Sequence, residues 1–250
     1  MKAPLWQELT SGELANLADI DAIAVLPIGS IEQHGPHLPL GTDTIIAESV
    51  AHTGIAKATM PTVALPTISM ALSSEHIWAK GTISIPPGQL FPLLDSIGAA
   101  LARAGIKRLV FLNGHGGNSA ALRVASRELR LSYGLLTFVA HPHIPVDQGG
   151  ATSGPFEIHA GHQETSIMLH LRPELVRMEL AEKCVPHWLD NYQMVGFGKP
   201  VSFGWTSDDF GKNGVIGDPA GANAAAGATA FLRAVNSFQS ALEEIARFYL

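Results

Sequence analysis

One segment of the sequence places two carboxylates and an imidazole close together. Glu32, His34 and Asp43 fall within twelve residues, directly after the apolar run at 22–29. The side chains of Glu32 and His34 point the same way if this segment is extended, because they are two residues apart. Considered alone, Asp43 is equally well explained as a charge at the start of a helix. Glu32 alone is well explained as a solvated loop residue. Together they favour a divalent-metal site, and mixed nitrogen and oxygen ligands suit Zn, Mn or Fe better than Ca.

A second segment, NGHGGN at 113–118, follows the apolar run at 108–112. Its glycines let the backbone turn sharply and leave His115 exposed. A glycine-rich turn before a helix can also hold phosphate, but the spacing is not G-x-G-x-x-G and no lysine follows. A lone histidine in such a turn is often structural. The matching positions of His115 and Glu32 after their apolar runs favour a metal ligand instead.

A third segment, EIHAGHQETS at 157–166, contains His159 and Glu164. One interpretation is a helix cap in which Glu164 offsets the helix dipole. The sharper hypothesis is that Glu164 is a further metal ligand and His159 a nearby base. His141 and His143 follow another apolar run and can approach the same crevice, although the sequence names no partner for them.

Strands alternate with helices in the predicted order of elements. Short apolar runs predict strands at 22–29, 62–68, 108–112 and 135–140. Caps, glycines and prolines predict helices at 10–17, 42–57, 87–104, 118–133, 162–171 and 219–249. This alternation predicts one α/β domain over 1–250, with a mainly parallel sheet covered on both faces. Ligands bind beyond the carboxyl ends of such strands, where the first two segments fall.

The composition excludes several classes of protein. The chain has 250 residues, of which 46% are apolar and 15% charged, and the low charged fraction argues against disorder and suggests a homo-oligomer. A net charge of −6 offers no basic surface for nucleic acid, and a single cysteine excludes an internal disulfide framework. We expect a soluble, cytoplasmic protein, because neither a signal-peptide core nor an apolar run long enough to span a membrane is found.

The sequence resembles the creatininase family of metal-dependent amidohydrolases. The matching motifs are LPIGSIEQHGPHLPLGTDT at 26–44, SSEHIWAKGTISI at 73–85, NGHGGN at 113–118, HAGHQETS at 159–166 and GVIGDPAGA at 214–222. They occur in order along almost the whole chain, and the first and third are highly specific together. The resemblance implies a three-layer α/β/α sandwich, assembled as a hexamer, with two divalent metal ions per chain drawn from Zn, Mn and Fe.

The resemblance also implies roles for particular residues. Four positions match the family's metal ligands: Glu32 and His115 for the first ion, His34 for the second, and Asp43 as the bridge between them. Creatininase takes a further second-metal ligand from a glutamate two residues after the histidine of its His-x-Glu-Asn segment, and that position is Gly117 here. We assign the open position to Glu164. His159 matches the family's proton-shuttle histidine.

The implied reaction is hydrolysis of a C–N bond in a small cyclic amide or formamide by metal-bound hydroxide, with His159 shuttling the proton. Gly117 puts creatinine itself in doubt as the substrate. The alternatives are a metal-dependent peptidase of cofactor maturation and a non-catalytic, ligand-binding member of the fold. A serine nucleophile is not expected, because no G-x-S-x-G elbow surrounds Ser74. The residues expected to contact a small-molecule substrate are Ser74, Gly116, Gly117, Asn118 and Trp205, the last within an aromatic loop at 196–217 that acts as a lid or simply packs.

Overall fold

The structure is a computed structural model that describes residues 3–142 and 156–250. At its centre lies a four-stranded sheet in the order β2-β1-β3-β4, and every described strand pair is parallel. The strands are β1 (Ile23–Ile28), β2 (Thr62–Ala64), β3 (Arg108–Asn113) and β4 (Leu136–Ala140). β1 and β3 pair along their whole length, up to Ile28 opposite Asn113, so these two central strands end side by side.

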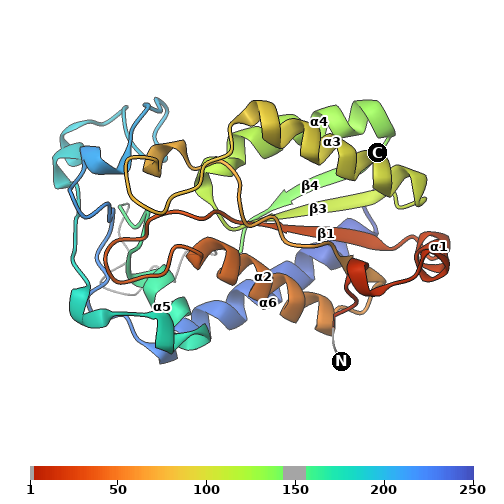
Figure 1. The fold of residues 1–250 in the computed structure, drawn as a ribbon, viewed down its shortest axis with the longest axis horizontal. Helices are drawn as coiled ribbons and strands as arrows, with labels where there is room; N and C mark the ends of the chain where they lie inside the picture. The colour runs from red at the N-terminus through yellow and green to blue at the C-terminus, as the bar shows by residue number, and fades with distance from the viewer. Residues whose placement is uncertain (1–2, 143–155) are drawn as a thin grey trace.

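Helices cover both faces of the sheet (Figure 1). One face packs against α2 (Thr42–Lys57), α5 (His162–Leu171) and α6 (Ala224–Ala246). The other packs against α3 (Pro87–Arg103) and α4 (Ser119–Tyr133), and the short α1 (Ser11–Asp19) joins the same hydrophobic cluster. The predicted three-layer α/β/α sandwich with a parallel sheet is therefore confirmed.

The sequence of β1 explains why both faces are covered. Ile23 and Val25 are buried in the hydrophobic cluster that includes α2 and α6, whereas Ala24 and Leu26 are buried in the cluster that includes α3 and α4. Successive strand side chains point to opposite faces, so a strand that is apolar at every position needs cover on both.

The second strand is shorter than predicted. The apolar run at 62–68 forms only the three residues of β2. Pro66 has no backbone N–H to donate to a neighbouring strand, so the ladder stops before it. Ile68 returns to the sheet as an isolated bridge to Ile28.

The last helix begins later than predicted, at Ala224 rather than at 219. Gly221 has a φ of 75°, in the left-handed region that a helix cannot use. Asn223 then caps the helix, since its side-chain oxygen accepts a hydrogen bond from the Ala226 N–H at 2.9 Å.

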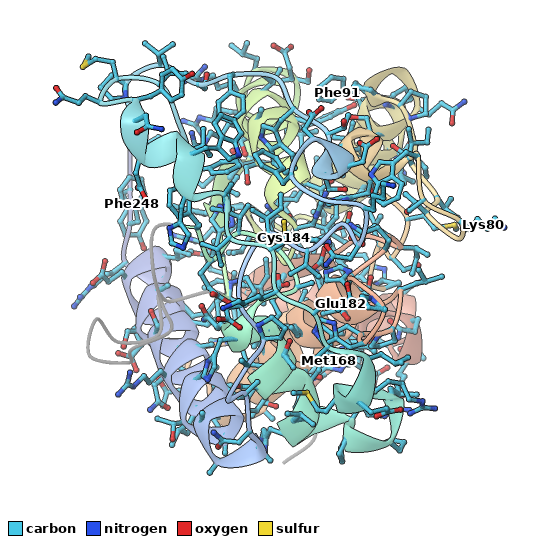
Figure 2. The ribbon with its side chains drawn as sticks, turned by 90° about the vertical axis from the view of Figure 1, so that its left-hand side faces the viewer. Lys80, Phe91, Met168, Glu182, Cys184 and Phe248 are labelled. Atoms are coloured by element: carbon cyan, nitrogen blue, oxygen red, sulfur yellow. The ribbon has the colours of Figure 1, made fainter. Side chains whose placement is uncertain are left out.

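Irregular segments gather at the carboxyl ends of the strands. The connection between α5 and α6 lies across this end, at the left of Figure 1, and Figure 2 views it face on with Glu182 and Cys184 near the centre. The connections there contain short 3-10 turns at Ser74–His76, Gly116–Asn118, Pro173–Leu175, Met178–Leu180, His187–Asn191 and Ser207–Asp209, and a further 3-10 turn at Trp6–Glu8 precedes α1. Within residues 3–142 and 156–250, no helix is long and apolar enough to cross a membrane.

Candidate functional site

The three predicted segments meet at the carboxyl ends of β1 and β3. Six side chains gather there from the loop after β1, the start of α2, the turn after β3 and the region around the start of α5: Glu32, His34, Asp43, His115, His159 and Glu164. Neighbouring parallel strands end at the same edge of a sheet, which explains why residues far apart in the sequence meet at this point. The structure thus brings together every residue for which a metal or proton-transfer role is predicted.

Two glycines allow α2 to start close to the strand ends. A Cβ on Gly29 would lie 2.6 Å from the backbone of Thr44, and a Cβ on Gly114 would lie 2.6 Å from the backbone oxygen of Asp43. Any larger residue at either position would push the first turn of α2 away. The glycines therefore place the Asp43 carboxylate beside the two strand ends.

The first group of possible metal ligands consists of Glu32, Asp43 and His115. Their ligand atoms lie within 4.8 Å of one another, and all three residues are buried. Nδ1 of His115 is 3.2 Å from Oε1 of Glu32 and 3.0 Å from Oδ2 of Asp43. Two carboxylates and one imidazole at these separations form a donor set that suits a transition-metal ion.

The second group consists of His34, His159 and Glu164, whose ligand atoms also lie within 4.8 Å of one another. Nε2 of His34 is 3.1 Å from Oδ1 of Asp43 and 3.9 Å from Oε2 of Glu164. Asp43 therefore faces the second group with Oδ1 and the first group with Oδ2. This is the placement expected of a carboxylate that bridges two ions.

The environment of Glu32 fits a metal ion. Its side chain is fully buried, yet neither carboxylate oxygen has a well-aligned hydrogen bond within the described part of the chain. A buried polar group without a partner costs about 1–3 kcal/mol, and more when it is charged. A divalent cation would supply the missing partner.

The electrostatics of the cluster point the same way. Burial lowers the pKa of His34, but the charge and hydrogen bond of Asp43 outweigh burial and raise this pKa to about 10. Burial also lowers the pKa of His115, and Glu32 and Asp43 raise it well above the usual range. Burial would raise the pKa of Asp43, but the two histidines hold it well below the usual range. The buried carboxylates therefore demand positive charge, which divalent cations also supply.

His159 presents one ring nitrogen to the cluster. Its Nε2 lies 2.7 Å from the backbone oxygen of Gln33, and because a carbonyl only accepts, Nε2 donates and Nδ1 keeps its lone pair. Nδ1 is 3.7 Å from Oε1 of Glu32. Burial, reinforced by the charge of His34, lowers the pKa of His159 well below its usual range, so the ring is neutral at pH 7. A neutral imidazole in this orientation can accept a proton at Nδ1.

A strained turn holds Glu164 at the cluster. The Ala160 N–H donates a 2.7 Å hydrogen bond to Oε2 of Glu164. Ala160 has a φ of 54°, in the left-handed region that costs a residue with a Cβ about 1–3 kcal/mol. Such strain persists only where the surroundings demand it, and here it fixes Glu164 beside His34.

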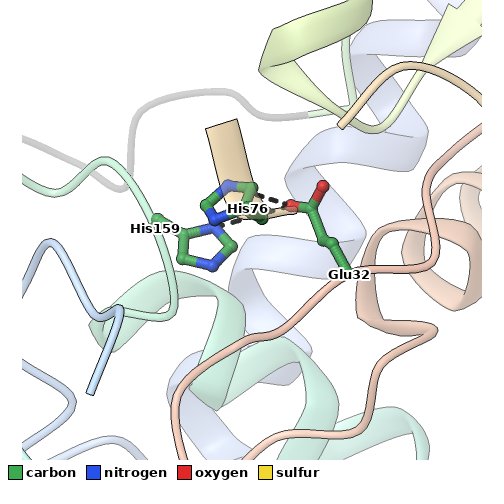
Figure 3. Close-up of side chains that lie close together, drawn as sticks. All are labelled: Glu32, His76 and His159. Atoms are coloured by element: carbon green, nitrogen blue, oxygen red, sulfur yellow. Dashed lines mark ion pairs between the residues drawn. The ribbon is translucent and has the colours of Figure 1, made fainter. Parts of the chain in front are cut away.

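Sequence reasoning missed His76, which lies in the same cluster (Figure 3). Its Nε2 is 3.5 Å from Oε1 of Glu32, and its ring stacks on that of His159 with 4.1 Å between the centroids. Its Nδ1 is 2.8 Å from Oγ of Ser207. Glu32, His76 and His159 form a third group whose ligand atoms lie within 4.8 Å of one another. The sequence offered one signal, because His76 lies within the family motif at 73–85. However, that motif has no strand or helix pattern, so the sequence did not indicate that it lies at the edge of the sheet.

The ligand cluster opens into a cavity of about 770 Å³. Four of the residues predicted to contact substrate line it: Ser74, Gly116, Gly117 and Trp205. Asn118 is instead buried, with its amide donating to the backbone oxygen of Gly29 at 3.0 Å and its Oδ1 accepting from the Leu72 N–H at 3.1 Å. The structure therefore places Asn118 where it ties loops together.

Further side chains shape the cavity wall. Trp205 packs against Phe197 and Phe210, with ring centroids 5.5 and 5.7 Å away, so the aromatics of the predicted loop both pack together and reach the cavity. Arg123 is the one lysine or arginine in the described lining. His141 also lines the cavity, whereas His143 lies outside the described residues.

Known proteins resemble this chain over most of its length. Residues 7–242 match the creatininase family model, described as creatinine amidohydrolase. A mycofactocin precursor peptide peptidase from Mycobacterium tuberculosis is 37% identical over 249 residues, which cover 94% of this chain and 90% of that protein. A creatinine amidohydrolase from Pseudomonas putida is 33% identical over 194 residues, which cover 70% of this chain and 72% of that protein.

Solved structures share the fold. They include a manganese form of creatininase and a Zn-Zn form of a creatininase mutant. Each superposes with a TM-score of 0.79 at 24% identity and covers 99% of this chain and 100% of its own. The three-layer arrangement described above is therefore the arrangement of these proteins as well.

Proposed function

The chain belongs to the creatininase family of hydrolases, and we propose that it cleaves an amide C–N bond at a site that holds two divalent metal ions. The observation that carries this proposal is the placement of Asp43. Its two oxygens lie 3.1 Å from Nε2 of His34 and 3.0 Å from Nδ1 of His115. A carboxylate with a different oxygen toward each of two imidazoles is placed to bridge two ions.

The other ligands follow from the two groups around Asp43. Glu32 and His115 would hold the first ion, and His34 and Glu164 would hold the second. Zn, Mn and Fe all suit this mixed donor set, and Mn and Zn are the metals named for the solved creatininases. When bound, the ions supply an activated water near neutral pH and polarise the amide carbonyl.

His159 is the proposed proton shuttle. Its Nε2 is held by the backbone oxygen of Gln33, so Nδ1 stays directed toward the ligands. A neutral Nδ1 first accepts a proton from the attacking water and then donates it to the leaving nitrogen. Stacking of the His76 ring on His159 limits rotation of the shuttle.

A short peptide is the substrate that the cavity favours. A volume of about 770 Å³ lies in the upper part of the range for small-molecule sites, so it accommodates more than a single small ring. Arg123 in the wall can pair with a carboxylate. The 37% identity to a peptide peptidase agrees with this class of substrate. We therefore place the proposed cleavage at an amide bond near the end of a short peptide.

A small cyclic amide or formamide is the second candidate substrate. The 33% identity to a creatinine amidohydrolase favours it. Gly117 argues against creatinine itself, because the ligand that the resemblance places at this position is missing.

Hydrolysis of a defined panel tests the proposal. Protein loaded with Zn²⁺ or Mn²⁺ is incubated with short peptides that have free or amidated ends, with formamides and with cyclic ureas, and new amines are detected by mass spectrometry. We expect cleavage of one class, abolished by a chelator and strongly reduced in His159→Ala. Failure of the loaded protein to cleave any member would contradict the amidohydrolase proposal and favour a ligand-binding role. The homo-oligomer implied by the resemblance stays a prediction.

A further inference from the structure

Gly117 leaves a space that another part of the chain fills. A Cβ on Gly117 would lie 2.2 Å from Oε1 of Glu75 and 2.4 Å from Nε2 of His115. Atoms that are not bonded do not approach this closely, so a side chain at 117 would displace the carboxylate or the imidazole. The carboxylate beside this turn therefore comes from Glu75 and not from position 117.

Two hydrogen bonds hold the segment that carries Glu75. Oδ1 of Asn118 accepts from the Leu72 N–H at 3.1 Å, which ties this segment to the turn containing His115. Oγ of Ser207 donates to the backbone oxygen of Glu75 at 3.3 Å. The Glu75 side chain is only 15% exposed. Its carboxylate is thus held against the His115 ring.

The two nitrogens of His115 face different groups. Nδ1 lies between the carboxylates of Glu32 and Asp43, at 3.2 and 3.0 Å. Nε2 lies 3.2 Å from Oε1 of Glu75. When one nitrogen of a histidine binds a metal, the other commonly donates to a carboxylate, which fixes the tautomer and the orientation of the ring. Glu75 occupies the position of that carboxylate.

We propose that Glu75 is a positioning residue for His115, whose Nε2–H it receives so that Nδ1 is directed at the first metal ion. This inference rests on the proposed two-metal function. Nε2 lacks a well-aligned hydrogen bond within the described residues, and contacts of this kind often become aligned only when the site is loaded. Glu75 belongs to none of the groups of possible ligands found in the described chain. It therefore acts through His115, by contacting the ring nitrogen that faces away from the other ligands.

Metal affinity tests this role without relying on turnover. Binding of Zn²⁺ and of Mn²⁺ is measured by competition with a chromophoric chelator for the wild type and for Glu75→Gln, which keeps the shape of the side chain but removes its charge. We expect the number of ions per chain to be unchanged and the affinity of one site to fall about 10-fold to 100-fold. Glu128→Gln, an exposed change on α4, is the matched control and should leave the affinity unchanged.

A double-mutant cycle separates positioning from a general structural effect. Gly117→Ala should crowd both the Glu75 carboxylate and the His115 ring and so lower the affinity at least as much as Glu75→Gln. Because both changes disrupt the same contact, the double variant should lose less affinity than the two single losses combined. Gly116→Ala is the control for metal affinity, because a Cβ there meets no atom within 4 Å.

The possible outcomes are distinguishable. An unchanged affinity in Glu75→Gln, or the loss of one whole ion from it, would overturn the positioning role while leaving the two-metal proposal in place. Additive losses in the cycle would also overturn it, because the two changes would then act independently. A wild-type protein that binds neither Zn²⁺ nor Mn²⁺ would overturn the proposed function itself and this inference with it.

Discussion

Two charged clusters lie at opposite ends of β1 and β3 and differ in how their charges are satisfied. At the amino end, the buried Arg108 pairs with Asp21, donates to the backbone oxygen of Ile245 at 3.1 Å and lies 5.1 Å from the ring of Tyr249. At the carboxyl end, the buried Glu32 has no well-aligned hydrogen bond within the described residues. Arg108 finds its partners within the chain, whereas the Glu32 carboxylate needs a group from outside.

This difference suggests that the cluster at the amino end of the two strands stabilises the fold, whereas the cluster at the carboxyl end serves the proposed chemistry. Arg108 meets its partners in the folded chain, so its contribution to folding needs no ligand. Burial raises the pKa of Glu32, because a charged carboxylate is costly to bury unless a cation or a proton neutralises it. Buried polar groups without a partner are often found at functional sites, so the environment of Glu32 supports the proposed metal site.

Removing His115 should break the carboxyl-end cluster most severely. We expect His115→Ala to lose one metal ion per chain and to lower turnover by at least about 10³-fold, since loss of metal polarisation removes several kcal/mol from transition-state stabilisation. The fold should survive, because the hydrophobic clusters on both faces of the sheet stay intact and the carboxylates that face His115 can take up protons in its place. Elemental analysis and circular dichroism check this, and retention of two ions would refute the ligand assignment.

Removing His159 should separate metal binding from proton transfer. We expect His159→Ala to retain its metal and to lower turnover by about 10²–10⁴-fold, the usual range for general acid–base catalysis. Steady-state kinetics on the substrate found in the panel, with metal content measured on the same sample, provide the check. A variant that turns over as fast as the wild type would show that the shuttle lies elsewhere.

Removing Arg108 should affect only the amino-end cluster. The Arg108 side chain is 2% exposed and that of Asp21 is 39% exposed, so we expect Arg108→Met to lower the free energy of unfolding by about 3 kcal/mol, the low end for breaking a buried pair. Metal content per folded chain should not change. Urea unfolding measures the effect, with the exposed neighbour Lys107→Met as the control. Loss of metal without loss of stability would mean that the two ends are not separate.

The pH dependence of metal binding tests the carboxyl-end cluster without any substitution. The raised pKa values of His34, about 10, and of His115 mean that both rings hold protons at neutral pH in the metal-free protein. Ligation requires these protons to leave, so affinity should rise with pH by about tenfold per pH unit for each proton released, until the pH passes the raised pKa values. Zn²⁺ titrations at several pH values in buffers that do not bind zinc test this. An affinity that falls or stays constant as pH rises would contradict it.

The part of the site that follows strand ends was predictable from the sequence. Glu32 and His115 directly follow apolar runs, and parallel pairing of β1 with β3 is enough to bring them together. His76 and Glu75 were not predictable in this way, because they lie on an irregular segment outside the strands and the long helices. Their positions depend on hydrogen bonds to Ser207, more than a hundred residues away in the chain, and no local pattern encodes such contacts.

The fold shows the same division. Periodicity and caps predict the order of strands and helices, because these signals are local. Two boundaries were predicted less well, because each depends on a single residue. Pro66 ends β2 early at Ala64, and Gly221 delays the start of α6 to Ala224. The apolar pattern continues through both positions and so does not reveal these boundaries.

Metal content tests the central claim most directly. Protein purified without chelator is analysed for transition metals per chain, beside Asp43→Ala and the exposed control Asp19→Ala. The two-metal site predicts about two ions per chain in the wild type and the control, and their loss in Asp43→Ala, because Asp43 faces both groups of ligands. A wild-type chain that holds no metal and takes up none from Zn, Mn or Fe would contradict the claim.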